Sequence, residues 1–195
     1  MIFGLTGGIA CGKSTVTKTF LKHGIPMVDA DQLARSVVEV GTIGYEMLLS
    51  YFGPEYFINY KLDRPKLGEL AFKDPTALKF LNATVGVLIE EEASLQFAKL
   101  KSEGHSLIGY DAALICERGN SHKYQPLIVV GCKPEIQLQR LMSRNNLTEA
   151  QAIARISAQM PTQKKLEMAH YSIDTSGTIE ESIEQTEQII EILRR

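Results

Sequence analysis

A glycine-rich stretch near the N-terminus constrains this chain more than any other feature. Residues 7–14 read Gly-Gly-Ile-Ala-Cys-Gly-Lys-Ser, which matches the G-x-x-x-x-G-K-[ST] pattern of a phosphate-binding loop. Its glycines let the backbone curl so that several N–H groups point at phosphate oxygens. An apolar segment precedes the stretch and a segment of helical periodicity follows it, so the loop would end at a helix N-terminus, which favours negative charge. We therefore predict an ATP site rather than a glycine-rich turn that only shapes the fold.

Two side chains of this loop carry the expected chemistry. Lys13 can reach the β- and γ-phosphates, where we expect it to act in catalysis, and the Ser14 hydroxyl suits a Mg²⁺ ligand. The residues of the loop expected to contact ATP are Gly8, Ala10, Cys11, Gly12, Lys13, Ser14 and Thr15.

Short apolar runs alternate with segments of helical periodicity along the rest of the chain, which is typical of an α/β fold with a parallel sheet. With 195 residues, of which 44% are hydrophobic, the chain is long enough for one domain with insertions. The segments predicted to be strands are 2–5, 25–28, 106–110, 127–131 and 171–173.

Two stretches exceed the minimal connection between parallel strands. Residues 41–104 place several helices between the second and third predicted strands, and residues 140–168 form a polar, Arg-rich helical pair between the fourth and fifth. Such insertions usually serve a ligand, because they overhang the carboxyl edge of the sheet. Helix start signals occur at Asp63, at Asp74 with Pro75, and in a capping box over 148–151, and a closing helix is expected over 178–194.

The bulk composition excludes several classes of protein. The formal net charge is −2, whereas a nucleic-acid binder usually carries a clustered basic face. The three cysteines form no C-x-x-C pair, which suits reduced thiols in a cytoplasm. All apolar runs are too short to span a bilayer. We therefore expect a cytoplasmic protein with no nucleic-acid or membrane partner.

Carboxylates are expected at the carboxyl ends of two strands. Asp29 and Asp31 follow the second predicted strand, where they would face the nucleotide crevice. One of them could take a proton from an acceptor hydroxyl; the alternative is that Asp31 only caps a helix over 32–40. Asp111 ends the third strand, where it either resembles a Walker-B metal partner or simply terminates the strand.

Arginines supply the cations that a phosphoryl-transfer enzyme needs on the migrating charge. Arg140 and Arg144 are four residues apart, so they share one helix face. The arginine fork is planar and always ionised, which suits this role. For Arg155, in the next predicted helix, a solvated surface position is the preferred interpretation.

Several motifs together resemble the dephospho-coenzyme A kinase family. Residues 4–15 resemble its phosphate loop, and residues 29–35 resemble its D-A-D-x-x-A-R motif. This pair of motifs at this spacing is much more specific than the loop alone. Further resemblances run in order along nearly the whole chain: Phe52-Gly53, Leu62-Asp63-Arg64 with Leu67, Ala71-Phe72, Asp111 through Glu117, Gln137 with Arg140 and Arg144, and Arg155-Ile156 with Gln159.

The resemblance implies a P-loop core with a five-stranded parallel sheet over 1–40, 105–139 and 169–195, a helical acceptor-binding insertion over 41–104, and a small lid over 140–168. It also implies that ATP, with Mg²⁺, phosphorylates the ribose 3′-hydroxyl of dephospho-coenzyme A. Asp31 would be the base, Arg140 would act in catalysis, and Arg140 and Arg144 would contact ATP from the lid. By the same analogy the metal would be held by Ser14 and Asp111, and the acceptor by Asp29, Asp31, Arg35, Asp63, Arg64 and Asp111.

The chain departs from the family pattern at four places. Gly86-Val87 stand where His-Pro is expected after Leu81-Asn82, and Ala113 replaces the proline of D-x-P-L-L-x-E. Thr175 replaces the asparagine of a late I-x-N-x-G, and Ala10 replaces the first glycine of the loop's G-x-G. Two alternatives therefore stay open: a nucleoside or deoxynucleoside monophosphate kinase, and a catalytically weak ATP-binding regulatory module.

Overall fold

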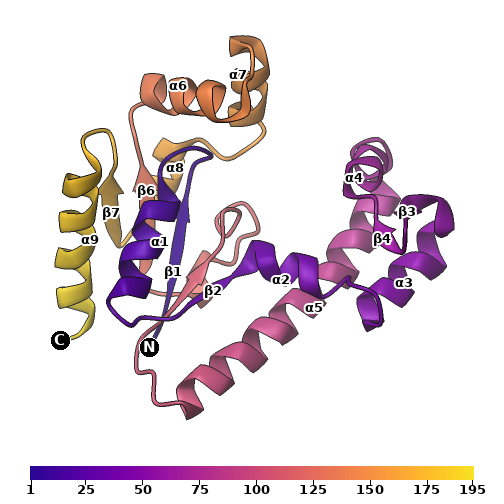
Figure 1. Ribbon diagram of the computed structural model, residues 1–195, viewed down its shortest axis with the longest axis horizontal. Helices are drawn as coiled ribbons and strands as arrows, with labels where there is room; N and C mark the ends of the chain where they lie inside the picture. The colour runs from indigo at the N-terminus through magenta and orange to yellow at the C-terminus, as the bar shows by residue number, and fades with distance from the viewer. The chain divides into compact units, whose positions relative to one another are not determined.

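The computed structural model describes residues 1–195, which divide into two compact units (Figure 1). One unit comprises Met1–Asp29 with Leu100–Arg195, and the other comprises Ala30–Lys99. The second unit begins before residue 41, where the sequence led us to expect the insertion. No helix is long and apolar enough to cross a membrane.

The first unit is built on a five-stranded parallel sheet with the order β2–β5–β1–β6–β7. Each strand overlaps a segment that the apolar runs predict, so the expected α/β class is confirmed. The strands are β1 (Ile2–Gly7), β2 (Met27–Asp29), β5 (Ile108–Asp111), β6 (Leu127–Gly131) and β7 (Tyr171–Asp174). The N-terminal strand β1 thus lies in the middle, with β5 on one side and β6 on the other.

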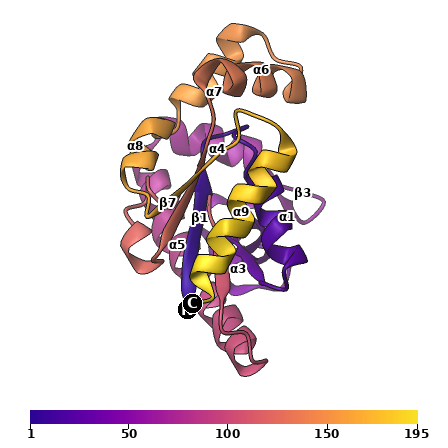
Figure 2. The same ribbon diagram turned by 90° about the vertical axis from the view of Figure 1, so that its left-hand side faces the viewer.

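Helices α1 (Lys13–Lys22) and α9 (Ile179–Leu193) pack against each other beside this sheet (Figures 1 and 2). Phe3 and Leu5 of β1 are fully buried in the same hydrophobic cluster as Phe20 of α1 and Ile190 of α9. All five residues of β6 are buried, as expected for a strand covered on both faces. This core holds the loop between β1 and α1 on a rigid base.

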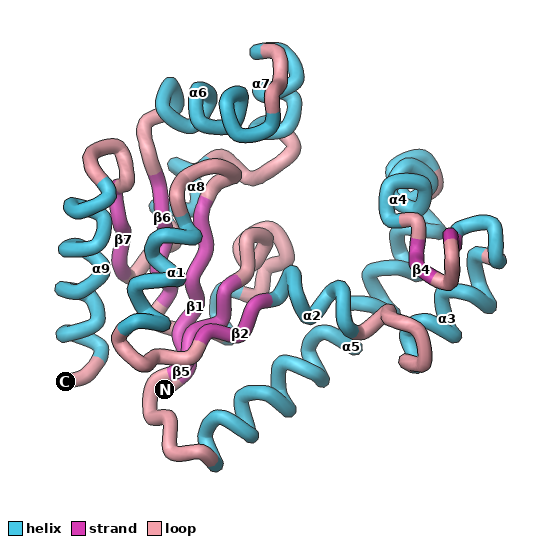
Figure 3. Tube along the Cα trace, viewed as in Figure 1, coloured by secondary structure: helices cyan, strands magenta, loops and turns pink.

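The remaining helices of the first unit follow β6. They are α6 (Pro134–Asn145), α7 (Glu149–Ser157) and α8 (Thr162–Glu167) (Figure 3). A short 3₁₀ helix, Ser121–Lys123, precedes β6. The predicted capping box is present, because the Thr148 hydroxyl accepts from the Gln151 N–H and the Gln151 side chain accepts from the Thr148 N–H.

The second unit is mostly helical. It contains α2 (Ala30–Ser36), α3 (Ile43–Phe52), a 3₁₀ turn (Pro54–Tyr56), a two-stranded hairpin of β3 (Phe57–Ile58) and β4 (Lys61–Leu62), α4 (Arg64–Lys73) and α5 (Pro75–Ser102), of which the last residues reach the first unit. Its core gathers Leu48, Phe52 and Leu67. The predicted start signals hold, since Asp63 caps α4 and the Asp74 carboxylate accepts from the Thr76 N–H.

Two features of this unit differ from the sequence-based expectation. Helix α2 begins at Ala30 and ends at Ser36, so Asp31 lies in its first turn and is not the N-cap of a helix over 32–40. The β-branched pair Val37-Val38 that follows is unfavourable for continuing the helix. The hairpin was not predicted, because its turn uses Asn59 and Tyr60 at φ 50° and 63° instead of the usual glycine.

Candidate active site

The glycine-rich stretch forms a tight loop between β1 and α1. Ala10 and Gly12 have φ of 61° and 77°, so the backbone curls through the left-handed region that glycine adopts most easily. Gly8 is required for packing, since a Cβ there would lie 2.4 Å from the Thr162 hydroxyl and 2.8 Å from the Gln137 amide nitrogen. Because α1 begins at Lys13, the loop presents N–H groups at a helix N-terminus, as a phosphate site requires.

Two glutamines from the segment after β6 fix the middle of the loop. The Gln137 amide donates to the Ile9 carbonyl at 2.9 Å, and the Ile9 N–H donates to the Gln159 amide oxygen at 3.0 Å. Gln137 is buried. Both polar groups of the Ile9 backbone are therefore satisfied by side chains, which restrains the loop.

Lys13 is held at the carboxyl end of β5. Its ammonium group forms an ion pair with the Asp111 carboxylate, and the other carboxylate oxygen accepts from the Thr17 hydroxyl at 2.7 Å. Asp111 is only 6% exposed, so its negative charge is stabilised by these two partners. The arrangement places a cation and a carboxylate side by side directly after the loop.

Thr175, just after β7, joins three parts of the site. Its hydroxyl lies 2.9 Å from the Cys11 carbonyl oxygen and 3.2 Å from that of Gly131. Arg140 donates to the same hydroxyl at 3.1 Å and to the Thr175 carbonyl oxygen at 2.8 Å. The threonine thus links the loop, the end of β6 and an arginine of α6.

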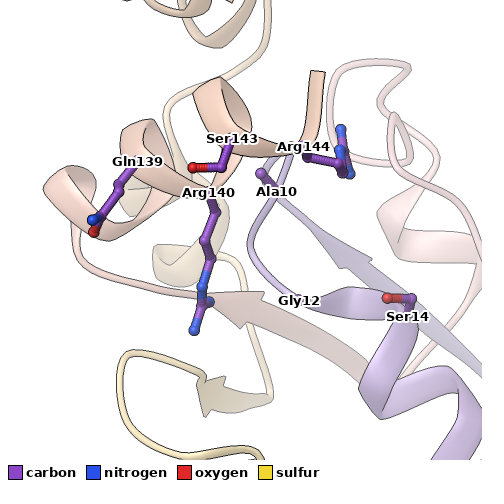
Figure 4. A pocket seen from close by; sticks show the side chains of 7 residues that line it. All are labelled: Ala10, Gly12, Ser14, Gln139, Arg140, Ser143 and Arg144. Carbon is purple, nitrogen blue, oxygen red and sulfur yellow. The ribbon is translucent and has the colours of Figure 1, made fainter. Parts of the chain in front are cut away.

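A pocket of about 580 Å³ opens between the loop and α6 (Figure 4). The Arg140 side chain extends from α6, while Arg144 is exposed and donates to the Asn145 side chain at 3.0 Å. The lining residues are Ala10, Gly12, Ser14, Gln139, Arg140, Ser143 and Arg144. The structure therefore brings three of the predicted loop residues, Ala10, Gly12 and Ser14, and both predicted arginines around one pocket.

Two cysteines meet beside the loop. The Cys132 S–H donates to the Cys11 sulfur, with the two sulfurs 3.4 Å apart. This hydrogen bond, more than a weaker contact with Thr162, lowers the pKa of Cys11 from 9.0 to about 7, although burial opposes the shift. The same hydrogen bond raises the pKa of Cys132, and burial and the negative charge on Cys11 act in the same direction.

A buried ion pair supports the segment that follows Asp111. Lys165 of α8 is 0% exposed, and its ammonium group lies 2.7 Å from the Glu117 carboxylate and 2.8 Å from the Ala113 carbonyl oxygen. The same Glu117 oxygen accepts from the Met160 N–H at 3.1 Å. Residues 113–117 are therefore fixed to the chain around α8.

The predicted acceptor residues fall in both units. Asp29 ends β2 directly opposite Asp111 in the sheet register, so two of the predicted carboxylates share the carboxyl edge. Asp31 lies in the helical unit, as do the remaining three, Arg35, Asp63 and Arg64. The Asp63 carboxylate accepts from the Lys66 N–H at 3.1 Å, which gives Asp63 a structural role as a helix cap.

Arg35 and Arg64 form a basic cluster within the helical unit. Burial, and then the nearby charge of Arg35, lowers the pKa of Arg64 below its usual value. One Arg64 nitrogen donates to the Ala34 carbonyl at 3.1 Å. Two cations held close together in this way favour the binding of an anion, because the anion offsets the repulsion between the two positive charges.

Several contributing residues were not identified as such from the sequence. Thr17 carries a usable signal, since it follows Lys13 by four residues and so shares its helix face. Gln137 and Gln159 were noted only through the family resemblance. Thr175, Lys165 and Cys132 carry no local signal, because their partners lie far away in the sequence.

The chain was also compared with known protein families. Residues 1–181 match the model of the dephospho-CoA kinase family. The chain belongs to the dephospho-CoA kinase family. A dephospho-CoA kinase from Bacillus cereus is 40% identical over 191 residues, which cover 97% of this chain and 96% of the relative. Members of this family are transferases that bind nucleotides through a P-loop and serve coenzyme A synthesis, so the enzyme class that the sequence indicated is confirmed.

Solved structures of similar fold extend the match to the whole chain. TT1252 from Thermus thermophilus superposes with a TM-score of 0.86 at 30% identity, covering 98% of this chain and 96% of that one. A dephospho-CoA kinase from Campylobacter jejuni gives a TM-score of 0.73 at 26% identity, with the same coverage. The P-loop kinase fold and the family resemblance are thereby both confirmed.

Proposed function

We propose that this protein transfers the γ-phosphoryl group of ATP to the ribose 3′-hydroxyl of dephospho-coenzyme A, giving coenzyme A and ADP. The observation that carries the proposal is the phosphate loop with Lys13 held beside Asp111, in a chain of the dephospho-CoA kinase family. The single buried carboxylate next to the loop lysine is the arrangement that a metal-dependent phosphoryl transfer needs.

On the ATP side, the loop N–H groups and Lys13 bind the β- and γ-phosphates. Arg140 and Arg144 line the same pocket, where they stabilise the charge that spreads over the transferred group. Thr175 holds the Arg140 guanidinium by two hydrogen bonds, so this arginine is oriented before substrate binds. Gly8, Ala10, Cys11, Gly12, Ser14 and Thr15 complete the binding loop.

The residues present fit a Mg²⁺ ion held largely by phosphate oxygens and water. No group of three or more His, Cys, Asp or Glu residues gathers in the structure, whereas Mg²⁺ commonly takes only one or two protein ligands beside phosphates. The exposed Ser14 hydroxyl and the Asp111 carboxylate would be those ligands. A bound ion would neutralise part of the negative charge on the phosphates.

On the acceptor side, the Arg35–Arg64 cluster suits the diphosphate of dephospho-coenzyme A. A diphosphate is an anion that can lie between the two positively charged side chains, and arginine binds phosphate in a fixed fork geometry. Asp31 belongs to the same helix as Arg35, and Asp29 lies just before that helix. Asp63 directly precedes Arg64. We assign Asp31 as the base that accepts the proton of the 3′-hydroxyl.

The test is an acceptor screen with ATP and Mg²⁺, in which the phosphorylated product is identified by mass. We expect dephospho-coenzyme A to be converted faster than any nucleoside monophosphate. Lys13→Ala should lower the rate roughly 10²-fold or more, because it removes a placed cation from developing charge. The control Lys18→Ala changes an exposed lysine of the same helix and should keep the wild-type rate.

Three other results would contradict the proposal. Faster turnover of a nucleoside monophosphate would indicate the alternative kinase, for which the missing His-Pro leaves room. ATP binding without any acceptor turnover would indicate a regulatory module. Near-normal activity of Lys13→Ala would mean that the triphosphate is bound elsewhere.

A further inference from the structure

Cys11 and Cys132, the cysteine pair, lie against each other where the nucleotide is proposed to bind. Their sulfurs are 3.4 Å apart, although the residues are 121 positions apart in the sequence. Cys132 follows β6 and has no part in the proposed reaction. The remaining cysteine, Cys116, is buried.

The pair has the properties of a reactive thiol site. Thiolates, not thiols, are the nucleophiles in sulfur chemistry. The hydrogen bond from Cys132 favours the thiolate of Cys11 near neutral pH, while the second proton is retained. Cys11 itself is 0% exposed, but Cys132 is partly exposed, which gives a small oxidant a route to the pair.

We propose that the cysteine pair is a redox modification site, at which a peroxide converts Cys11 and Cys132 into a reversible disulfide that weakens ATP binding. The disulfide itself does not depend on the proposed acceptor. Its effect on ATP binding and on phosphoryl transfer rests on the ATP site of the proposed function.

The chemistry balances with hydrogen peroxide as the oxidant. A Cys11 thiolate attacks one peroxide oxygen, the O–O bond breaks, and the departing hydroxide takes up a proton to become water. The Cys132 sulfur then attacks the resulting sulfenic acid, the S–O bond breaks, and a second water leaves as the S–S bond forms. Two thiols lose two electrons in total, and the peroxide is reduced to two waters. A dithiol reverses the process by exchange.

The loop geometry explains why this bond would affect ATP. A disulfide brings its sulfurs to about 2.05 Å, so the two sulfurs must move more than 1 Å closer than the 3.4 Å observed. The Cys11 backbone is restrained at both ends, since its N–H donates to Gly8 and its carbonyl accepts from Thr175. Movement of Cys11 therefore shifts the loop N–H groups that face the phosphates. A misplacement of about 1 Å in an active site can lower the reaction rate by roughly 10²-fold.

The experiment compares reduced and peroxide-treated protein. Intact mass should fall by two hydrogens, and peptide mapping should identify a Cys11–Cys132 crosslink. ATP affinity, measured by titration without acceptor, should fall at least about tenfold and return after dithiothreitol. Cys132→Ser should keep its ATP affinity under the same treatment. Cys116→Ser, the matched control, should respond as the wild type does.

Three results would overturn the proposal: no crosslink between Cys11 and Cys132, a crosslink that leaves ATP affinity unchanged, or an equal loss of affinity in Cys132→Ser. These readouts need neither dephospho-coenzyme A nor turnover. A failure of the acceptor screen on reduced protein would therefore be distinguishable from a failure of the disulfide.

Discussion

Among the individual residues, Asp31 is the one whose proposed role depends most on the acceptor. It lies in the first turn of α2, where a carboxylate also interacts favourably with the helix dipole. A ribose hydroxyl is a poor nucleophile at neutral pH, so a carboxylate that accepts its proton helps late in the transfer.

Asp31→Asn should therefore lower kcat by roughly 10²–10⁴-fold, the usual span for loss of a general base. Asparagine keeps the shape of the side chain, so the ATP dissociation constant should change little. Both quantities are measured on one preparation, with circular dichroism to confirm folding. Asp29→Asn is the matched control and should reduce kcat less. A large loss of Mg·ATP affinity in Asp31→Asn would instead identify Asp31 as a metal-site residue.

Lys165 and Glu117 form an asymmetric ion pair, because the Lys165 side chain is 0% exposed and the Glu117 side chain is 21% exposed. Removing the glutamate leaves a fully buried cation without its counter-charge. Glu117→Leu should therefore destabilise the protein by about 3–5 kcal/mol. Lys165→Met leaves a carboxylate that water can reach, and should cost clearly less.

The measurement is the free energy of unfolding from denaturant titration of both single variants and the double variant. The double variant should be more stable than Glu117→Leu alone, because Lys165→Met removes the buried ammonium group that Glu117→Leu leaves without a counter-charge. Equal costs for the two single variants would show that the pair contributes through packing rather than charge.

Some residues of the site could be predicted from the sequence and others could not, for a physical reason. Lys13, Ser14 and the arginines could be placed because a short motif or a helical spacing fixes their geometry. Thr175 could not, since its hydrogen bond to Cys11 spans 164 positions and depends on which strands become neighbours. Asp31 was recognised as a candidate, but its helix starts at Ala30, two residues earlier than a capping role would need.

At the scale of elements, the candidate lid is residues 140–168, which comprise the second half of α6 together with α7 and α8. Arg140 and Arg144 belong to α6, while α7 is exposed along most of its length and buries only Ala152. A closed lid would exclude water, which otherwise competes as phosphate acceptor.

Hydrogen exchange over 140–168 should therefore slow when ATP and an acceptor analogue bind together. The slowing should exceed that produced by ATP alone, because closure needs both substrates in place. Exchange over α9 serves as the internal control, since this helix packs on the core. Identical exchange with and without both ligands would remove the lid from the mechanism.

The elements themselves were predicted in proportion to the strength of their local signals. The five strands of the main sheet follow from short apolar runs bounded by polar residues, and the capped helices follow from Asp63, Asp74 and Thr148. The hairpin of β3 and β4 has only two residues per strand, which is too short for any periodicity to be recognised. The single long helix α5 replaces part of what was expected as several helices, because Gly86 does not interrupt it.

At the scale of the whole molecule, the chain leaves the first unit after Asp29 and returns at Leu100. No change in composition marks either crossing, so these boundaries could not be read from the sequence. The parallel sheet could be predicted from the alternation of strands and helices. Its strand order could not, because it is decided by the packing of β5 and β6 on both sides of β1.

The central place of β1 also sets when the site can form during translation. The phosphate loop is synthesised before both neighbours of β1, which come after residue 107. The Thr175 hydroxyl, which bonds the Cys11 carbonyl, is made later still. At about 5–20 residues per second, synthesis of the 164 positions that separate the two residues takes roughly 8–33 s. A nascent chain therefore carries the complete phosphate-loop motif well before the hydrogen bond that restrains it can form.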